Sequence, residues 1–390
     1  MLGKKSKIRE LSEFAVARGK QIGYENVFDF TLGNPSVPAP LEFTNEMIRL
    51  LENTEPTSLH GYSQSLGIYE VREAVARSLC ERFGLPYKAE HIFMTSGAAG
   101  AIAHAVRCIS EAGDEIITFA PYFPEYIPYV NQTGARLKVV SADFNGFQIK
   151  FDELESLINE KTAAVLINTP NNPSGVVYSE QTLLRLAELL HKKQIEYGHE
   201  IFLISDEPYR EIVFDGKEYP APATYYENTV MCYSFSKSLS IPGERIGYVA
   251  FPPSHKDAAT MATMCGQISR GIGHNCPASI IQLAICKCLD KTADLSVYET
   301  NRNLICECLD RLGFTYVKPD GTFYVLPKAL EDDAASFCEK ALEYDLVFVP
   351  ADTFGASGYF RIAYCVETEK VKRALVALEK FVREVYGDKR

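Results

Sequence analysis

The chain has 390 residues, of which 46% are hydrophobic and 23% are charged. This length and composition are typical of a folded protein with a large α/β core and a smaller companion domain. The formal net charge of −11 excludes non-specific binding to nucleic acid or to an anionic membrane, since both need a basic surface. Nowhere do about 18 apolar residues follow one another, so no membrane span is expected. With no signal-like leader, we expect a cytoplasmic protein.

The chain contains eleven cysteines, which we expect to be reduced thiols because no export signal accompanies them. Two Cys-x-Cys pairs, Cys286/Cys288 and Cys306/Cys308, raise the possibility of a zinc site. Both pairs lie in segments with helical character, where positions i and i+2 point to different faces of the helix. We therefore expect these thiols to be buried as small apolar side chains, and we expect no metal.

From about residue 90 onward, short β-rich apolar runs alternate with longer helical stretches, such as the one over 180–193. That alternation predicts an α/β fold with a mostly parallel, seven-stranded sheet covered by helices. The seven predicted strands are 91–95, 115–119, 137–141, 163–168, 201–205, 230–234 and 247–251.

The pattern changes after Pro277, where we predict a long helical stretch to about Leu312. A smaller block follows, with a strand at 321–326, a helix at 333–343 and strands near Val347 and Phe360. We therefore expect a large domain over 46–285 and a small α+β domain over 286–390. Residues 1–45 lack the alternation, and we expect them to form an N-terminal arm and part of the small domain, or to contact a partner subunit.

Polar residues interrupt the predicted strands at their C-terminal ends, which meet at one edge of such a sheet and are where its ligands bind. Residues 96–100 (Ser-Gly-Ala-Ala-Gly) follow the first strand and open an apolar helix. Small residues there let backbone N–H groups face a phosphate, although a tight turn without a ligand has the same composition. Residues 168–175 end the fourth strand, where two prolines leave Asn171 and Asn172 to present their amides, or form a turn that needs no partner.

Three ionisable residues follow at the same edge. Asp206 ends the fifth strand, and a buried carboxylate there predicts a positive group opposite it. Lys237, in Ser-Phe-Ser-Lys, supplies an amine that burial would make nucleophilic toward an aldehyde, and Arg245 supplies a permanent charge suited to phosphate. Together these groups match pyridoxal 5'-phosphate, which has an aldehyde, a pyridine nitrogen and a phosphate.

These motifs, in this order, resemble those of the fold-type I, class I/II aminotransferases that use pyridoxal phosphate, close to the aspartate aminotransferase group. The resemblance extends over residues 33–361. It implies that Lys237 forms a Schiff base with the cofactor, that Asp206 pairs with its ring nitrogen, and that Tyr209 and Asn172 bond its ring hydroxyl. It also implies a ring-stacking role for Phe123, which stands where the family often has tryptophan. The implied phosphate-binding residues are Gly97, Ala98, Ala99, Ser234, Ser236 and Arg245.

The same resemblance implies a homodimer with active sites at the subunit interface, because Tyr62 matches a tyrosine that reaches the phosphate of the neighbouring subunit. Arg361 matches the arginine that binds the substrate α-carboxylate, with Gly33 closing over it. The implied reaction is a ping-pong transamination between an L-amino acid and a 2-oxo acid, in which Lys237 moves the proton as general base and then acid. We further hypothesise that Arg270 binds the side-chain carboxylate of aspartate or glutamate; an ordinary surface arginine is the alternative.

Other functions stay open at this point. The amino acid could be alanine or an aromatic residue, since Ala99 stands where some bacterial aspartate aminotransferases have a lysine for the distal carboxylate. A pyridoxal-phosphate carbon–sulfur β-lyase would use the same lysine, aspartate and phosphate-binding residues. A cofactor-binding regulator would need an added DNA-binding module, for which this chain has neither the length nor the basic charge.

Overall fold

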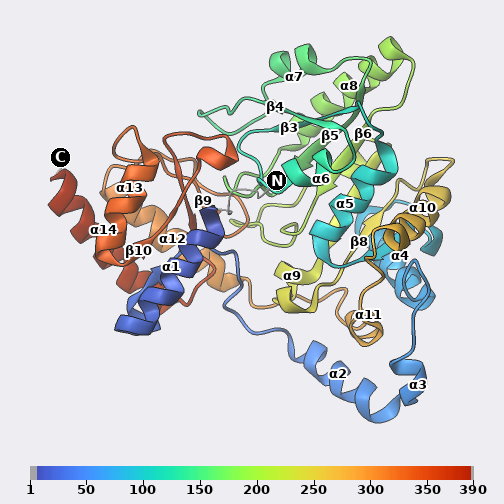
Figure 1. Ribbon diagram of the computed structural model, residues 1–390, viewed down its shortest axis with the longest axis horizontal. Coiled ribbons are helices and arrows are strands. Elements are labelled where there is room, and N and C mark those ends of the chain that lie inside the picture. The colour runs from blue at the N-terminus through green and yellow to red at the C-terminus, as the bar shows by residue number, and fades with distance from the viewer. Residues whose placement is uncertain (1–6, 388–390) are drawn as a thin grey trace.

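The computed structural model describes residues 7–387, and Figure 1 shows two bodies joined side by side. The larger body contains a seven-stranded sheet and its helices. The smaller body contains the C-terminal helices together with the first helix of the chain, α1 (Lys7–Ile22). Within the described residues, no helix has the length and apolar character needed to cross a membrane.

The seven-stranded sheet confirms the predicted α/β fold. Its order is β2-β8-β7-β6-β5-β3-β4, and only β8 runs antiparallel to its neighbours. Each predicted strand corresponds to an observed one within one residue at either end. The strands are β2 (Ile92–Thr95), β3 (Glu115–Phe119), β4 (Arg136–Val140), β5 (Thr162–Asn168), β6 (Phe202–Asp206), β7 (Thr229–Ser234) and β8 (Gly247–Ala250).

Helices cover both faces of this sheet, which explains why its central strands are apolar at consecutive positions. On β5, Leu166 packs in the core beneath α5 (Gly97–Ile109), α6 (Tyr126–Asn131) and α10 (Ala258–Gly271). Its neighbour Val165 faces the other side and packs beneath α7 (Phe151–Leu157) and α8 (Glu180–Tyr197). The β2 end of that second face is covered by α4 (Tyr69–Phe83) and α11 (Ser279–Ile285).

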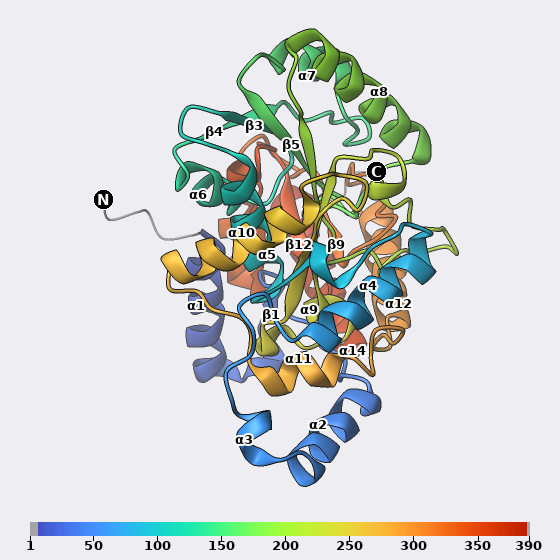
Figure 2. The ribbon, with the colours of Figure 1, turned by 90° about the vertical axis from the view of Figure 1, so that its right-hand side faces the viewer.

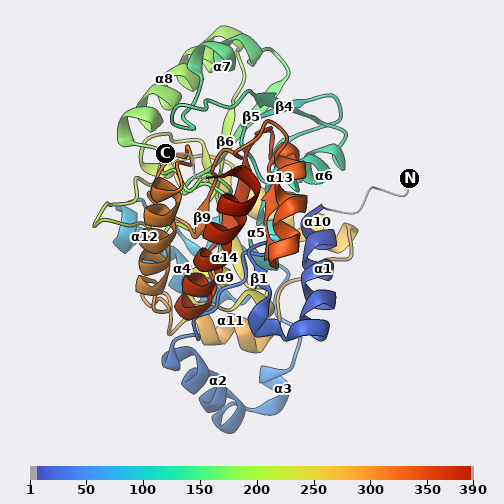
Figure 3. The same cartoon turned by 90° about the vertical axis from the view of Figure 1, so that its left-hand side faces the viewer.

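The smaller body is built on two small sheets, seen behind its helices in Figure 3. One pairs β1 (Phe28–Asp29) with β10 (Leu346–Val347) in parallel, and the other has the order β11-β12-β9. The strands of the second sheet are β9 (Tyr324–Val325), β11 (Val349–Pro350) and β12 (Phe360–Ala363). These sheets share a core with α12 (Ser296–Arg311), α13 (Ala334–Ala341) and α14 (Thr368–Tyr386).

The single long helix predicted after Pro277 is wrong. Helix α11 ends at Ile285, and α12 begins eleven residues later along the chain, at Ser296. The intervening segment includes charged residues, and Asp294 accepts hydrogen bonds from the backbone N–H and hydroxyl of Ser296 in a local turn just before α12. Cys286 and Cys288 therefore follow a helix end instead of lying within a helix, while Cys306 and Cys308 lie in α12 and are buried.

A helical arm, α2 (Leu41–Asn53) and α3 (Pro56–Leu59), extends from the body at the end opposite α7 and α8 (Figure 2). The expected domain boundary at residue 45 falls inside α2, which packs against α11 of the large body. We therefore propose that the large domain begins at α2 and ends with α11. The described residues before α2 would then belong with 286–387, because β1 pairs with β10.

Candidate active site

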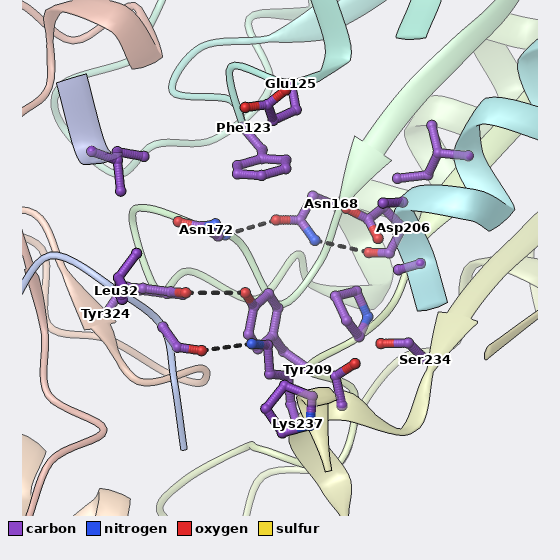
Figure 4. A pocket seen from close by; sticks show the side chains of 18 of the residues that line it. Leu32, Phe123, Glu125, Asn168, Asn172, Asp206, Tyr209, Ser234, Lys237 and Tyr324 are labelled. Atoms are coloured by element: carbon purple, nitrogen blue, oxygen red, sulfur yellow. Dashed lines mark hydrogen bonds between the residues drawn. The ribbon is translucent and has the colours of Figure 1, made fainter. Parts of the chain in front are cut away.

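A cavity of about 420 Å³ lies where the two bodies meet, at the C-terminal ends of three adjacent parallel strands. The last residues of β5, β6 and β7 are Asn168, Asp206 and Ser234, and all three line it. Most of the residues predicted to bind cofactor or substrate also line it: Gly33, Ala98, Ala99, Phe123, Asn172, Asp206, Tyr209, Ser234, Ser236, Lys237, Arg245 and Arg361. Figure 4 shows how ten of the lining residues lie.

Asp206 is buried at the floor of the cavity. The hydroxyl of Tyr126 donates to Asp206 Oδ2 at 2.6 Å, and the amide of Asn168 donates to the backbone carbonyl of Asp206 at 2.9 Å. Asp206 Oδ1 is buried and accepts no hydrogen bond from the described residues. Burial raises the pKa of Asp206 to about 7, against the lowering effect of the Tyr126 hydrogen bond. A cationic donor entering the cavity would satisfy this unpartnered oxygen.

Lys237 lies in the short helix α9 (Phe235–Ser238), just past the end of β7. Its Nζ donates to the carbonyl of Gly33 at 2.6 Å, which ties the N-terminal segment to the large domain (Figure 4). Burial, together with the charges of Arg245 and Arg361, lowers the pKa of Lys237 to about 8. The amine is therefore neutral in a substantial fraction of molecules near pH 8, which is the form that attacks an aldehyde.

Arg361, on β12, reaches the cavity from the small body and is buried. Its Nη1 donates to Asn172 Oδ1 at 3.0 Å, and its Nη2 donates to the carbonyl of Thr31. The guanidinium also lies 4.7 Å from the ring centre of Tyr324. Its Nε is buried and has no hydrogen-bond partner among the described residues. A carboxylate could accept from this N–H and pair with the charge.

The loop after β5 holds Asn172 in place for Arg361. The backbone N–H of Asn172 donates to Asn168 Oδ1 at 2.7 Å, and Asn171 accepts from the hydroxyl of Ser174 at 2.7 Å. This loop is thus ordered by its own asparagine side chains. The hydroxyls of Tyr209 and Tyr324, which also line the cavity, lie 3.2 Å apart (Figure 4).

The end of the cavity beside the start of α5 suits an anion. Helix α5 begins at Gly97, so its first N–H groups, including those of Ala98 and Ala99, have no partner within the helix. Arg245 Nη2 donates to the carbonyl of Ser96 at 3.3 Å and brings a positive charge beside this helix end. Gly97 has φ +74, a backbone conformation that favours glycine, and its lack of a Cβ leaves room for Arg245 Nη2, which would stand 2.7 Å from one.

Three of the predicted site residues, Gly97, Tyr62 and Arg270, do not line the cavity of their own chain. Tyr62 is fully exposed, and Arg270 is exposed in the last turn of α10. Both were expected to act across a dimer interface, so their roles remain predictions.

Sequence reasoning missed three residues that the structure places at the site. Asn168 was seen only as the start of a loop, although its amide orders both Asn172 and Asp206. Tyr126 lies in a short helix after β3, and Tyr324 lies in a strand of the small body, with no polar motif around either. The sequence carried no signal that these tyrosines approach Asp206 and Arg361, because each contact joins segments far apart in the chain.

Comparison with known proteins places this geometry in a family. The family described as "Aminotransferase class I and II" matches residues 25–378. The chain is 32% identical to an aspartate aminotransferase of Thermotoga maritima, with 97% of this chain and 96% of that protein covered. It is 30% identical to an aromatic-amino-acid aminotransferase of Thermococcus litoralis, with the same coverage.

Solved structures agree with these relatives. An amino transferase from Eubacterium rectale superposes with a TM-score of 0.94 and is 48% identical, covering 98% of this chain and 96% of its own. The aspartate aminotransferase of Thermotoga maritima superposes with a TM-score of 0.88 at 31% identity, covering 97% of this chain and 98% of its own. The chain therefore belongs to the class I and II aminotransferases, and it is an enzyme that transfers amino groups.

Proposed function

We propose that this aminotransferase binds pyridoxal 5'-phosphate in the cavity and moves the amino group of an acidic L-amino acid, aspartate or glutamate, to a 2-oxo acid. The observation that carries the proposal is Asp206, a buried carboxylate whose Oδ1 has no hydrogen-bond partner among residues 7–387. It shares its cavity with Lys237, whose lowered pKa of about 8 makes the neutral amine available. A protonated pyridine nitrogen supplies the missing donor, and the cofactor's aldehyde suits the lysine.

The residues present fit each part of the cofactor. Asp206 would hold the ring nitrogen, and Lys237 would hold the aldehyde carbon. Tyr209 and Asn172 would bond the ring hydroxyl, while Phe123 would cover one ring face. The phosphate would lie among the N–H groups at the start of α5 and the side chains of Ser234, Ser236 and Arg245, a set that combines a helix N-terminus with a permanent charge.

The chain's own side chains then account for transamination. When bound, the cofactor supplies an electron-accepting ring that weakens the Cα–H bond of the attached substrate. Arg361 binds the substrate α-carboxylate and so orients that bond. Lys237, once the substrate amine replaces it on the cofactor, would take the proton from the substrate Cα as general base and deliver it as general acid to the carbon that carried the aldehyde. Asp206, ionised when it is paired with the cofactor, would hold a proton on the ring nitrogen.

The substrate preference rests on Arg270 and on a second subunit. Ala99 stands where some bacterial aspartate aminotransferases have a lysine for the substrate's side-chain carboxylate, and alanine cannot bind that group. Arg270 is exposed and does not line the cavity of its own chain. We propose a homodimer in which Arg270 and Tyr62 enter the neighbouring site. Exposed apolar side chains on the helical arm, Leu41, Ile48 and Leu51, support such an interface. Related enzymes named for aspartate also support an acidic substrate.

Half-reactions with single amino acids test the proposal. The cofactor-loaded enzyme is mixed with aspartate, glutamate, alanine or phenylalanine without any acceptor, and its visible absorption is followed. We expect aspartate or glutamate to bleach the band stoichiometrically, and 2-oxoglutarate or oxaloacetate to restore it. Arg270→Ala should lower the rate with aspartate at least tenfold while leaving alanine unchanged, with Arg270→Lys intermediate. An unchanged preference would remove Arg270 from the account, and continuous pyruvate release from a thioether amino acid would indicate a lyase.

A further inference from the structure

A second carboxylate lies directly behind Asp206. Glu207 follows the last residue of β6, so its side chain points to the opposite face of the sheet. Asp206 lines the cavity and contacts Tyr126 on one face. Glu207 is fully buried on the other face, does not line the cavity, and is held by a backbone bond from its N–H to the carbonyl of Cys232 at 2.8 Å.

Glu207 is the inner end of a chain of charges that leads to the surface. Its Oε2 lies 3.8 Å from Arg210 Nη1, beyond hydrogen-bond distance. Arg210 is itself buried, lies 3.8 Å from the ring centre of Tyr233, and donates from Nε to Glu211 Oε1 at 2.9 Å. Glu211 Oε1 also accepts from Arg82 of α4 at 2.6 Å. Glu211 is therefore paired twice, whereas Glu207 shares one distant cation.

The cluster holds more negative charge than its buried cation offsets. Two buried carboxylates, Glu207 and Glu211, flank the one buried cation Arg210, and Arg82 nearer the surface also pairs with Glu211. The Glu207 oxygens make no hydrogen bond of good geometry with the described residues. Burial raises the pKa of Glu207 to about 7 and outweighs the nearby hydroxyls of Ser205 and Tyr219, which lower it. Two consecutive, poorly compensated carboxylates repel each other, and a cation on the cavity side of Asp206 would relieve that repulsion.

We propose that Glu207 is a positioning residue for the cofactor: its carboxylate behind Asp206, when ionised, makes Asp206 a stronger acceptor for the protonated ring nitrogen. The inference rests on the proposed function, since it presumes pyridoxal phosphate in the cavity. A purely structural role, in which Glu207 only supports Arg210, makes a different prediction, because a neutral side chain of the same size would preserve the packing.

The test compares two ligands on cofactor-free enzyme. Pyridoxal phosphate carries the ring nitrogen, and its deaza analogue has carbon at that position. For Glu207→Gln we expect the Kd of pyridoxal phosphate to rise about tenfold and the Kd of the analogue to change less than about twofold. Glu211→Gln is the matched control, because it removes a neighbouring carboxylate that is paired with two cations of its own. It should leave the Kd of both ligands close to the wild-type values. If Glu207→Gln does not fold, Glu207→Met removes the same charge and carries the same prediction.

Each outcome decides between the two roles. Weaker binding of pyridoxal phosphate, with unchanged binding of the analogue, supports the inference. It is strengthened if Glu207→Asp restores the wild-type ratio of the two Kd values. Equal weakening of both ligands, or no weakening, overturns it in favour of a structural role. If the wild-type protein binds neither ligand, the proposed function fails, and that result is visible before any variant is measured.

Discussion

Replacing Asp206 by asparagine should stabilise the cofactor-free protein while weakening cofactor binding. In the folded chain, burial raises the pKa of Asp206 from 3.8 to about 7. In the unfolded chain the carboxyl ionises near 3.8, so the folded protein binds the extra proton between those values and loses stability as pH rises through that window. Asparagine is similar in size, can still accept from Tyr126, and never ionises.

The size of the effect follows from the pKa difference. About three pKa units at about 1.4 kcal/mol each give roughly 4 kcal/mol of lost stability at pH 8, and roughly 1.5 kcal/mol at pH 5. The new amide N–H groups have no acceptor, which costs about 1 kcal/mol at both pH values. The variant should therefore exceed the wild type by about 3 kcal/mol at pH 8 and by less than about 1 kcal/mol at pH 5.

Urea unfolding of both cofactor-free proteins at pH 5 and pH 8 measures this difference. Adding pyridoxal phosphate should then reverse the order, because only the wild-type carboxylate gains a cationic partner. A stability difference that is the same at both pH values would show that Asp206 is not an uncompensated buried carboxyl, and the reasoning about its ligand would fall with it.

Three further predictions concern the lysine, the arginine and the glycine of the site. The rate at which cofactor-free enzyme captures pyridoxal phosphate should rise with pH and level off above a midpoint near 8, since the pKa of Lys237 is about 8 and only its neutral form reacts; stopped-flow absorbance checks this, and a midpoint above about 10 would contradict it. Arg361→Lys should lower kcat/KM for the amino acid by about 10²–10³ through loss of its forked donors while leaving cofactor affinity within about twofold; steady-state kinetics and equilibrium titration separate the two. Gly33→Ala would place a Cβ 1.9 Å from the Tyr324 hydroxyl, so we expect it to lower thermal stability by a few kcal/mol and activity with it, and Tyr324→Phe in the same chain should restore part of the stability; no change in either would show that this close approach is absent.

The sheet could be predicted because its central strands are covered on both faces and therefore read as unbroken apolar runs. Where such a run ends in a polar residue, as at Asn168, Asp206 and Ser234, the sequence marks the edge of the sheet as well as the strand. Parallel pairing then brings those ends together without any further information. This is why most of the predicted residues line one cavity.

The parts that could not be predicted depend on contacts between distant segments. Tyr126 and Tyr324 sit in apolar surroundings along the chain, and only folding brings their hydroxyls to Asp206 and Tyr209. The interruption between α11 and α12 was missed because leucines and cysteines on either side continue the helical period across a short segment that includes charged residues. Tyr62 and Arg270 require a second subunit, so a single chain leaves their roles as predictions.

The central claim is that Lys237 holds pyridoxal phosphate in this cavity, and reductive trapping tests it most directly. The purified enzyme, loaded with cofactor, is treated with sodium borohydride, digested and mapped by mass spectrometry. The account predicts one modified peptide, with the cofactor's mass on Lys237, and no modification of the Lys237→Ala variant treated in the same way. Trapping at another lysine, or a reducible absorption band that survives in Lys237→Ala, would contradict the account.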